Sequence, residues 1–153
     1  MRLKEFLRAD FVVPQLTARD VDGVVAEVSA QAAAAGVGPE DLISEKLLER
    51  ERSHPTVIGS GLAIPHATVP GLKAPVIGVA LAREEIPFAG PDEEGARLFF
   101  VLLSPPGYER EHVKLLARIC RLVRHQGIFD ELENASDAAH VIEIIEAVDA
   151  QHA

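Results

Sequence analysis

The order of predicted elements indicates an α/β fold: a single domain over residues 1–153, with a mixed parallel and antiparallel sheet of about five strands flanked by helices. Three observations lead to this prediction. A strand, two helices, several strands and further helices follow one another, as in layered α/β proteins. The stretch Leu98–Leu103 is an unbroken apolar run, typical of a central strand buried on both faces. Elsewhere apolar residues recur at helical spacing, and no internal repeat divides the chain.

The amino-terminal region predicts a short strand followed by a helix. Residues 11–16 have the apolar pattern of the strand. Valines at helical spacing then predict a helix over residues 21–35. Thr17 and Asp20 form a weak capping pattern before this helix, and Gly36 is expected to end it.

A second helix is expected to carry Pro39 in its first turn and to end near Arg50–Glu51. Its last turn, Glu49–Arg52, alternates acidic and basic side chains. A charge cluster of this kind is usually solvated helix surface. On these residues alone, Arg50 has no assigned function.

The stretch Pro55–His66 combines glycines, a short apolar run and a histidine. Gly59 and Gly61 allow a sharp turn or the close approach of a ligand. The run Leu62–Ile64 predicts a strand, which the following proline is expected to end because it lacks an N–H. His66 is then presented at a rigid strand end, where an imidazole suits nucleophilic or acid–base chemistry. The alternative is a capping or surface histidine.

The centre of the chain predicts two further strands. A loop rich in proline and glycine over residues 69–75 precedes a β-branched strand over 76–81. Residues 84–92 are expected to form a turn region. The apolar run 98–103 then supplies the central strand.

The carboxy-terminal part predicts three helices. The first begins near Glu109, ends at Gly127 and has a predicted inward apolar stripe at Val113, Leu116, Ile119, Cys120 and Val123. A short helix is expected over residues 129–132. Ser136 is expected to cap a last helix that reaches Val148.

Composition excludes several classes of protein. The net charge of −9 argues against a nucleic-acid binder, which needs a basic surface. No apolar run approaches membrane-spanning length, and no signal peptide is evident, so we expect a soluble cytoplasmic protein. The single cysteine, Cys120, cannot form an internal disulfide and is expected to be a buried apolar residue. We expect neither a metal nor a cofactor, since no pair of cysteines has zinc-binding spacing.

A second histidine, His112, lies in the first turn of the helix that follows the central strand. In α/β proteins, ligand contacts concentrate past the carboxyl ends of strands and at helix starts. The alternative is an exposed histidine in a helix's first turn. A metal site of His54, His66 and His112 is a further, weaker alternative, because no helical pair of ligands supports it.

The motif residues resemble those of a known family when they are taken together. They are Arg50-Glu51, Thr56, Gly59, Gly61 and the string Ala63-Ile64-Pro65-His66. This pattern resembles the enzyme IIA domain of the bacterial phosphotransferase system, of the fructose/mannitol and nitrogen-regulatory type. The resemblance covers about residues 10–148 and implies a mixed sheet of about five strands flanked by helices.

The resemblance also implies roles for individual residues. His66 would carry a phosphoryl group, and His112 would be the second histidine, in the pattern H-x-x-x-L-A. Arg50 would turn back towards His66 as the family's arginine, supplying a permanently charged, forked donor. Thr56 and the backbone near Gly59 and Gly61 would contribute to the phosphoryl-binding site, because phosphoryl transfer depends mostly on positioning and charge stabilisation.

Two residues depart from the family pattern. Ala67 follows the histidine where the family often has glycine, and Pro55 precedes the threonine where serine is common. Neither change removes a reacting group. Both bear on partner choice and on the transfer rate.

The resemblance predicts a phosphohistidine carrier, a phosphoryl-transfer protein and not an enzyme that turns over independently. Its donor would be phosphorylated HPr or a nitrogen-branch homologue. The sequence shows no membrane domain and no IIB-like region, which favours a stand-alone regulatory IIA acting on a target protein. The alternatives are a sugar-specific IIA that passes phosphate to a separate IIB, and a module that binds partners without phosphorylation.

Overall fold

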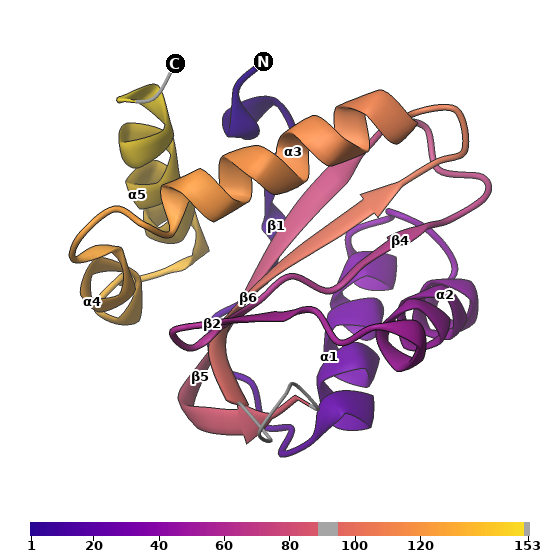
Figure 1. The fold of residues 1–153 in the computed structure, drawn as a ribbon, viewed down its shortest axis with the longest axis horizontal. Coiled ribbons are helices and arrows are strands. Elements are labelled where there is room, and N and C mark those ends of the chain that lie inside the picture. Colours follow the sequence, from indigo (N-terminus) through magenta and orange to yellow (C-terminus); the bar gives the residue numbers. More distant parts are fainter. Residues whose placement is uncertain (89–94, 152–153) are drawn as a thin grey trace.

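One sheet separates two groups of helices in the computed structural model, which describes residues 1–88 and 95–151 (Figure 1). Helices α1 and α2 cover one face, and α3, α4 and α5 cover the other. The elements follow one another as the 3-10 helix η1 (Leu3–Glu5), β1 (Leu7–Val13), α1 (Val21–Ala34), α2 (Glu40–Ser53), β2 (Val57–Gly59), β3 (Leu62–Ala63), β4 (His66–Thr68), β5 (Val76–Pro87), β6 (Gly95–Ser104), α3 (Glu109–Leu122), α4 (Ile128–Glu133) and α5 (Ala138–Ala150).

The sheet has the strand order β1-β5-β6-β3-β2, and β4 also pairs with β6. The pairs β1/β5, β3/β6 and β4/β6 are parallel, whereas β5/β6 and β2/β3 are antiparallel. The prediction of a mixed α/β sheet is therefore confirmed. Among the described residues the sheet has six strands, where about five were expected. Strands β2 and β4 were not predicted because each has only three residues and lacks a long apolar run.

Strand β6 contributes to two apolar cores, one on each side of the sheet. Alternate side chains face opposite sides because strand residues alternate with a period of two. Towards α1 and α2 lie Phe99, Val101 and Leu103. Towards α3, α4 and α5 lie Leu98, Phe100 and Leu102. A continuous apolar run is what a strand covered on both faces requires.

The predicted bounds of the first strand and the predicted end of β5 were wrong. The first strand spans residues 7–13 instead of 11–16 and ends just before Pro14. Strand β5 continues through the expected turn to Pro87, because an irregularity after Leu81 allows Ile86 and Pro87 to pair with the start of β6. Residues 89–92 of the expected turn lie outside the described residues.

Pro65 lies between β3 and β4, and the chain remains hydrogen-bonded to β6 at this residue. Its carbonyl accepts a hydrogen bond from the Leu102 amide at 3.0 Å, although its nitrogen cannot donate. His66 therefore opens β4, paired with Leu102, instead of following the end of a strand as predicted. The ladder with β6 fixes the position of His66.

The helices were predicted in the right order, with errors at their ends. Asp20, not Thr17, caps α1, and Asp137, not Ser136, caps α5; each carboxylate accepts from the amide three residues later. Helix α2 begins after Pro39, which is its cap, and runs on to Ser53.

Helix α3 buries a different stripe from the predicted one. Leu115, Ile119 and Leu122 are buried, whereas Val113 is 65% exposed. Cys120 is only partly buried and packs against the core on this side of the sheet. Among the residues that the structure describes, no helix combines the length and apolar character that crossing a membrane needs.

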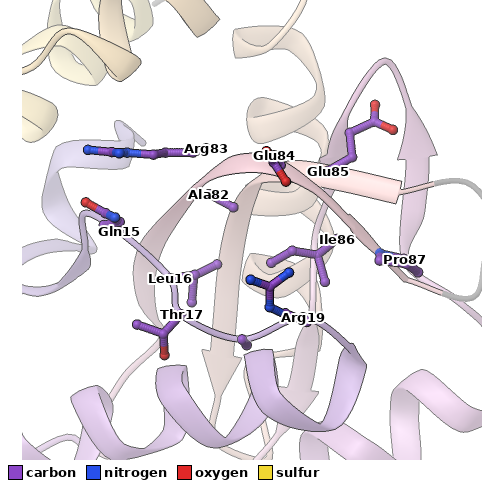
Figure 2. A pocket seen from close by; sticks show the side chains of 11 residues that line it. Gln15, Leu16, Thr17, Arg19, Ala82, Arg83, Glu84, Glu85, Ile86 and Pro87 are labelled. Atoms are coloured by element: carbon purple, nitrogen blue, oxygen red, sulfur yellow. The ribbon is translucent and has the colours of Figure 1, made fainter.

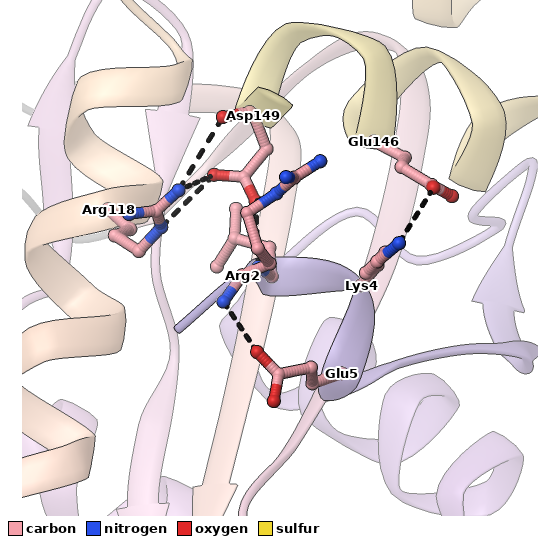
Figure 3. A network of polar contacts seen from close by, with 7 residues as sticks. Arg2, Lys4, Glu5, Arg118, Glu146 and Asp149 are labelled. Atoms are coloured by element: carbon pink, nitrogen blue, oxygen red, sulfur yellow. Dashed lines mark hydrogen bonds and ion pairs between the residues drawn. The ribbon is translucent and has the colours of Figure 1, made fainter. Parts of the chain in front are cut away.

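Asp149 of α5 joins three segments through a buried carboxylate (Figure 3). It accepts hydrogen bonds from the Leu3 amide and from the Arg118 guanidinium, each at 2.7 Å, and Arg2 lies 3.5 Å away. The nearby pair between Lys4 and Glu146 is exposed. Asp149 and Glu146, both in α5, therefore make ion pairs of very different burial.

We expect Asp149→Ala to lower the free energy of unfolding by roughly 3 kcal/mol, since it leaves buried donors without an acceptor. Glu146→Ala is the matched control and should cost less than about 1 kcal/mol, because exposed pairs contribute little. Urea denaturation of both variants measures the difference. Equal losses would show that the buried carboxylate has no special structural role.

Candidate functional site

The imidazole of His66 is fixed by the backbone two residues before it. Its Nδ1 lies 2.7 Å from the carbonyl oxygen of Ile64. A carbonyl only accepts, so Nδ1 carries the hydrogen and donates it, which leaves a lone pair on Nε2 of the neutral ring. Burial lowers the pKa of His66; the bond to Ile64 opposes this shift and the Arg50 guanidinium adds to it.

His112 occupies the first turn of α3, directly after β6. Its Nδ1 lies 2.7 Å from the hydroxyl oxygen of Ser104, the last residue of β6. Burial, followed by the neighbouring His66 and Arg50, lowers the pKa of His112 to about 4. Near neutral pH the ring is therefore uncharged.

The fold brings the two histidines together from positions far apart in the sequence. Their ring centroids are 5.4 Å apart, with an angle of 58° between the ring planes. Two imidazoles that both bond one tetrahedral anion lie roughly 3–7 Å apart, so this separation is compatible with a shared anion between them. Each ring has its Nδ1 engaged by a neighbour, so the Nε2 atoms are left for a ligand.

Arg50 lies in the last turn of α2, which packs beside β4, the strand that His66 opens. Its guanidinium donates to the His54 carbonyl at 2.9 Å, and its charge lowers the pKa of both His66 and His112. The charge of Arg50 therefore acts on both rings. The site combines a fixed positive charge with two neutral rings.

Glu51 was not among the predicted site residues, although it stands next to Arg50. Glu51 is 4% exposed, and its carboxylate accepts from the amide and hydroxyl of Thr56, at 2.6 and 2.7 Å. Burial raises the pKa of Glu51, while the hydrogen bonds from Thr56 and the charge of Arg50 oppose the shift. A buried carboxylate is retained only with such partners, so this pair holds the end of α2 against the chain beyond it.

Thr56 continues this connection to His66. Its carbonyl accepts from the Ile64 amide at 3.0 Å, and the Ile64 carbonyl in turn accepts from His66. Thr56 is therefore placed as a support for the imidazole and for the end of α2. The sequence feature that could have indicated this pair is a carboxylate at the end of a helix, five residues before a threonine.

The glycine turn lies away from the histidines. Gly59, Ser60 and Gly61 all have positive φ and form the turn between β2 and β3. Leu62 pairs with Leu98, whereas His66 pairs with Leu102 four residues further along β6, which corresponds to about 13 Å of strand. The structure thus does not bring Gly59 and Gly61 to the two imidazoles.

The surroundings of His112 include a small, mainly apolar hollow of about 240 Å³, lined in part by Tyr108 and Val113. Within the described parts of the chain, no three His, Cys, Asp or Glu side chains are grouped so as to hold a metal ion. His54 is exposed; its carbonyl accepts from the Arg50 guanidinium, and its amide donates to the Arg50 carbonyl.

A larger hollow of about 500 Å³ lies between the β1–α1 connection and the second half of β5 (Figure 2). Leu16 and Ile86 face it, while Arg83 and Glu85 extend away. The histidines sit beside the opposite end of β5, where Val76 pairs with Leu103. This hollow therefore belongs to another part of the molecule.

The site's chemistry is set by these contacts. A neutral imidazole with a free Nε2 lone pair is a nucleophile. The neighbouring ring and the guanidinium can both donate hydrogen bonds to an anion. The arrangement suits the acceptance of a group that brings negative charge with it, such as a phosphoryl group.

The chain is similar to known proteins over most of its length. A family model described as "Phosphoenolpyruvate-dependent sugar phosphotransferase system, EIIA 2" matches residues 5–148. A nitrogen regulatory protein of Bradyrhizobium diazoefficiens is 32% identical over 146 residues, 95% of each chain. A fructose-specific EIIA component of Haloferax volcanii is 30% identical over 112 residues, 73% of each chain. The crystal structure of IIA-Ntr from Neisseria meningitidis superimposes with a TM-score of 0.83 at 25% identity, covering 93% of this chain and 97% of that one.

We expect His112 to titrate well below the ordinary histidine pKa of about 6.5, at about 4. Between these values the unfolded chain binds more protons than the folded protein. The stabilisation from neutral His112 is thus complete above about pH 6.5 and is lost as the pH falls towards 4.

Nuclear magnetic resonance of the ring protons measures the titration, and urea denaturation at pH 7 and 4.5 measures the stability. His112→Asn should reduce the loss of stability between the two pH values. A midpoint near 6.5 for His112 would contradict the expected burial effect.

Proposed function

Because the chain belongs to the phosphoenolpyruvate-dependent sugar phosphotransferase system EIIA 2 family, we propose that it carries a phosphoryl group on His66 Nε2. The observation that carries this proposal is the bond from His66 Nδ1 to the Ile64 carbonyl, since it leaves Nε2 as the free nucleophilic nitrogen. The lowered pKa of His66 keeps the nucleophile unprotonated near neutral pH.

The proposed step is a balanced transfer between two nitrogens. The Nε2 lone pair of His66 attacks the phosphorus of a phosphohistidine on the donor protein. A nitrogen–phosphorus bond forms on His66 as the donor's nitrogen–phosphorus bond breaks, and the electron pair returns to the donor's imidazole. Arg50 and His112 stabilise charge on the three phosphoryl oxygens.

We propose phosphorylated HPr, or its nitrogen-branch counterpart, as the donor. Nitrogen regulatory and fructose-specific relatives are both similar to this chain. A nitrogen regulatory relative is 32% identical over 95% of the chain, which supports a regulatory role in which the phosphorylation state controls a target protein.

The second candidate is a sugar-specific IIA that passes its phosphoryl group to a separate IIB, and the similarity to the fructose-specific component supports it. The two roles differ in the fate of the phosphoryl group. Incubating the phosphorylated protein with a fructose-type IIB distinguishes them, since only the sugar-specific role requires rapid loss of the label to IIB.

We expect one acid-labile phosphate per chain after incubation with labelled phosphoenolpyruvate, enzyme I and HPr or the nitrogen-branch pair. His66→Ala should abolish the label and keep the fold, because His66 is a half-buried residue outside both cores. His54→Ala is the matched control and should be labelled normally. A labelled, folded His66→Ala protein would refute the assignment.

We expect Arg50→Ala to slow phosphorylation of His66 by roughly ten- to a hundredfold, the kinetic equivalent of a charge-assisted hydrogen bond of about 1.5–3 kcal/mol. Arg52 lies in the same helix turn, is exposed and forms a long ion pair with Asp22, at 4.0 Å. Arg52→Ala should therefore be labelled at the normal rate. Quenched-flow labelling compares the two, and equal rates would remove Arg50 from the site.

A further inference from the structure

Ser104 is in contact with the site but takes no part in the transfer step itself. It is 2% exposed, and its hydroxyl lies 2.7 Å from His112 Nδ1. Its backbone carbonyl makes a separate hydrogen bond, accepting from the Val69 amide. Among the described residues, the Ser104 side chain has no other hydrogen-bond partner.

A hydroxyl can donate to a ring nitrogen or accept from it, so this pair has two arrangements. If His112 carries its hydrogen on Nδ1, the buried Ser104 hydroxyl accepts, and its own hydrogen has no acceptor. If His112 carries it on Nε2, the hydroxyl donates to Nδ1 and both groups are satisfied. Burial makes the first arrangement costly, because an unpaired buried donor loses its bond to water.

The position of the hydrogen also matters to an anion between the rings. With Nδ1 engaged by Ser104, only Nε2 of His112 is left for a ligand. An Nε2 lone pair would repel a phosphoryl oxygen, whereas an Nε2–H donates to it. Both considerations select the same tautomer.

We propose that Ser104 is a positioning residue whose hydroxyl donates to His112 Nδ1 and so keeps the ring hydrogen on Nε2, where it donates to a phosphoryl oxygen. The last part rests on the proposed function. The two rings are then complementary: His66 has its hydrogen on Nδ1 and a lone pair on Nε2, and His112 has the reverse. An acceptor-only carbonyl sets the first tautomer and a hydroxyl sets the second.

The test begins with the unphosphorylated protein, labelled with nitrogen-15 in its histidines. Two-bond proton–nitrogen correlation spectra identify the protonated nitrogen of each ring. We expect His112 to be protonated on Nε2 in the wild type. In Ser104→Ala the ratio of the two tautomers should shift towards Nδ1–H by roughly 2- to 12-fold, the equivalent of one ordinary hydrogen bond.

Two further variants separate positioning from a general structural effect. Ser104→Thr retains the hydroxyl and should restore the wild-type spectrum. Ser29→Ala removes another buried hydroxyl, one with no hydrogen-bond partner among the described residues, and should leave His112 unchanged. A wild-type His112 protonated on Nδ1, or a tautomer ratio that is the same in Ser104→Ala as in the wild type, overturns the proposal.

Labelling completes the test. Ser104→Ala should still accept phosphate on His66, with transfer slowed by roughly 2- to 12-fold, and Ser104→Thr should recover the rate. Failure of His66 to accept phosphate in the wild type would refute the proposed function, while the spectra would still decide the tautomer. An unchanged transfer rate in Ser104→Ala, with the tautomer shifted, would remove the role in phosphoryl binding.

Discussion

The parallel ladder between β4 and β6 is the constraint on which the site depends. It pairs His66 with Leu102, and two residues later Thr68 pairs with Ser104, whose hydroxyl contacts His112. Strand β6 therefore sets the positions of both imidazoles. A slip of one residue would turn each β4 side chain to the other face of the sheet. Strand β6 cannot slip in this way without disrupting the packing of two cores, because it is buried on both faces.

Polar contacts around this ladder complete the site from the α2 side. Glu51 is costly to bury, and its two bonds from Thr56 offset that cost while fixing the helix end that carries Arg50. The same threonine reaches Ile64, and Ile64 reaches His66. His66 and the helix end that carries Arg50 are therefore held by one connected set of hydrogen bonds. This connection explains why a buried carboxylate is found next to a site that suits an anion.

Much of the fold could be predicted from apolar periodicity, because long elements such as α1 and β6 repeat their pattern over many residues. Short strands such as β4 have no such pattern; they exist because β6 offers them a partner, and this long-range pairing cannot be seen locally. The meeting of Arg50, His66 and His112 was inferred from a family resemblance, since nothing in their spacing brings them together. Glu51 and Ser104 were missed because their roles lie in partners that only the fold supplies, and the glycine turn was misjudged because its distance from His66 depends on strand register.

The neutrality of the second imidazole has a consequence for the proposed carrier, which has to pass its phosphoryl group on to an acceptor. A carrier is useful only if the loaded form retains a high phosphoryl-transfer potential, so that the next acceptor can take the group. Two permanent cations beside the phosphoryl group would stabilise the phosphorylated protein further and oppose transfer of the group to an acceptor. A single guanidinium with an uncharged donor ring stabilises the incoming group less. The burial that lowers the pKa of His112 therefore favours reversible transfer of the phosphoryl group over its tight retention on His66.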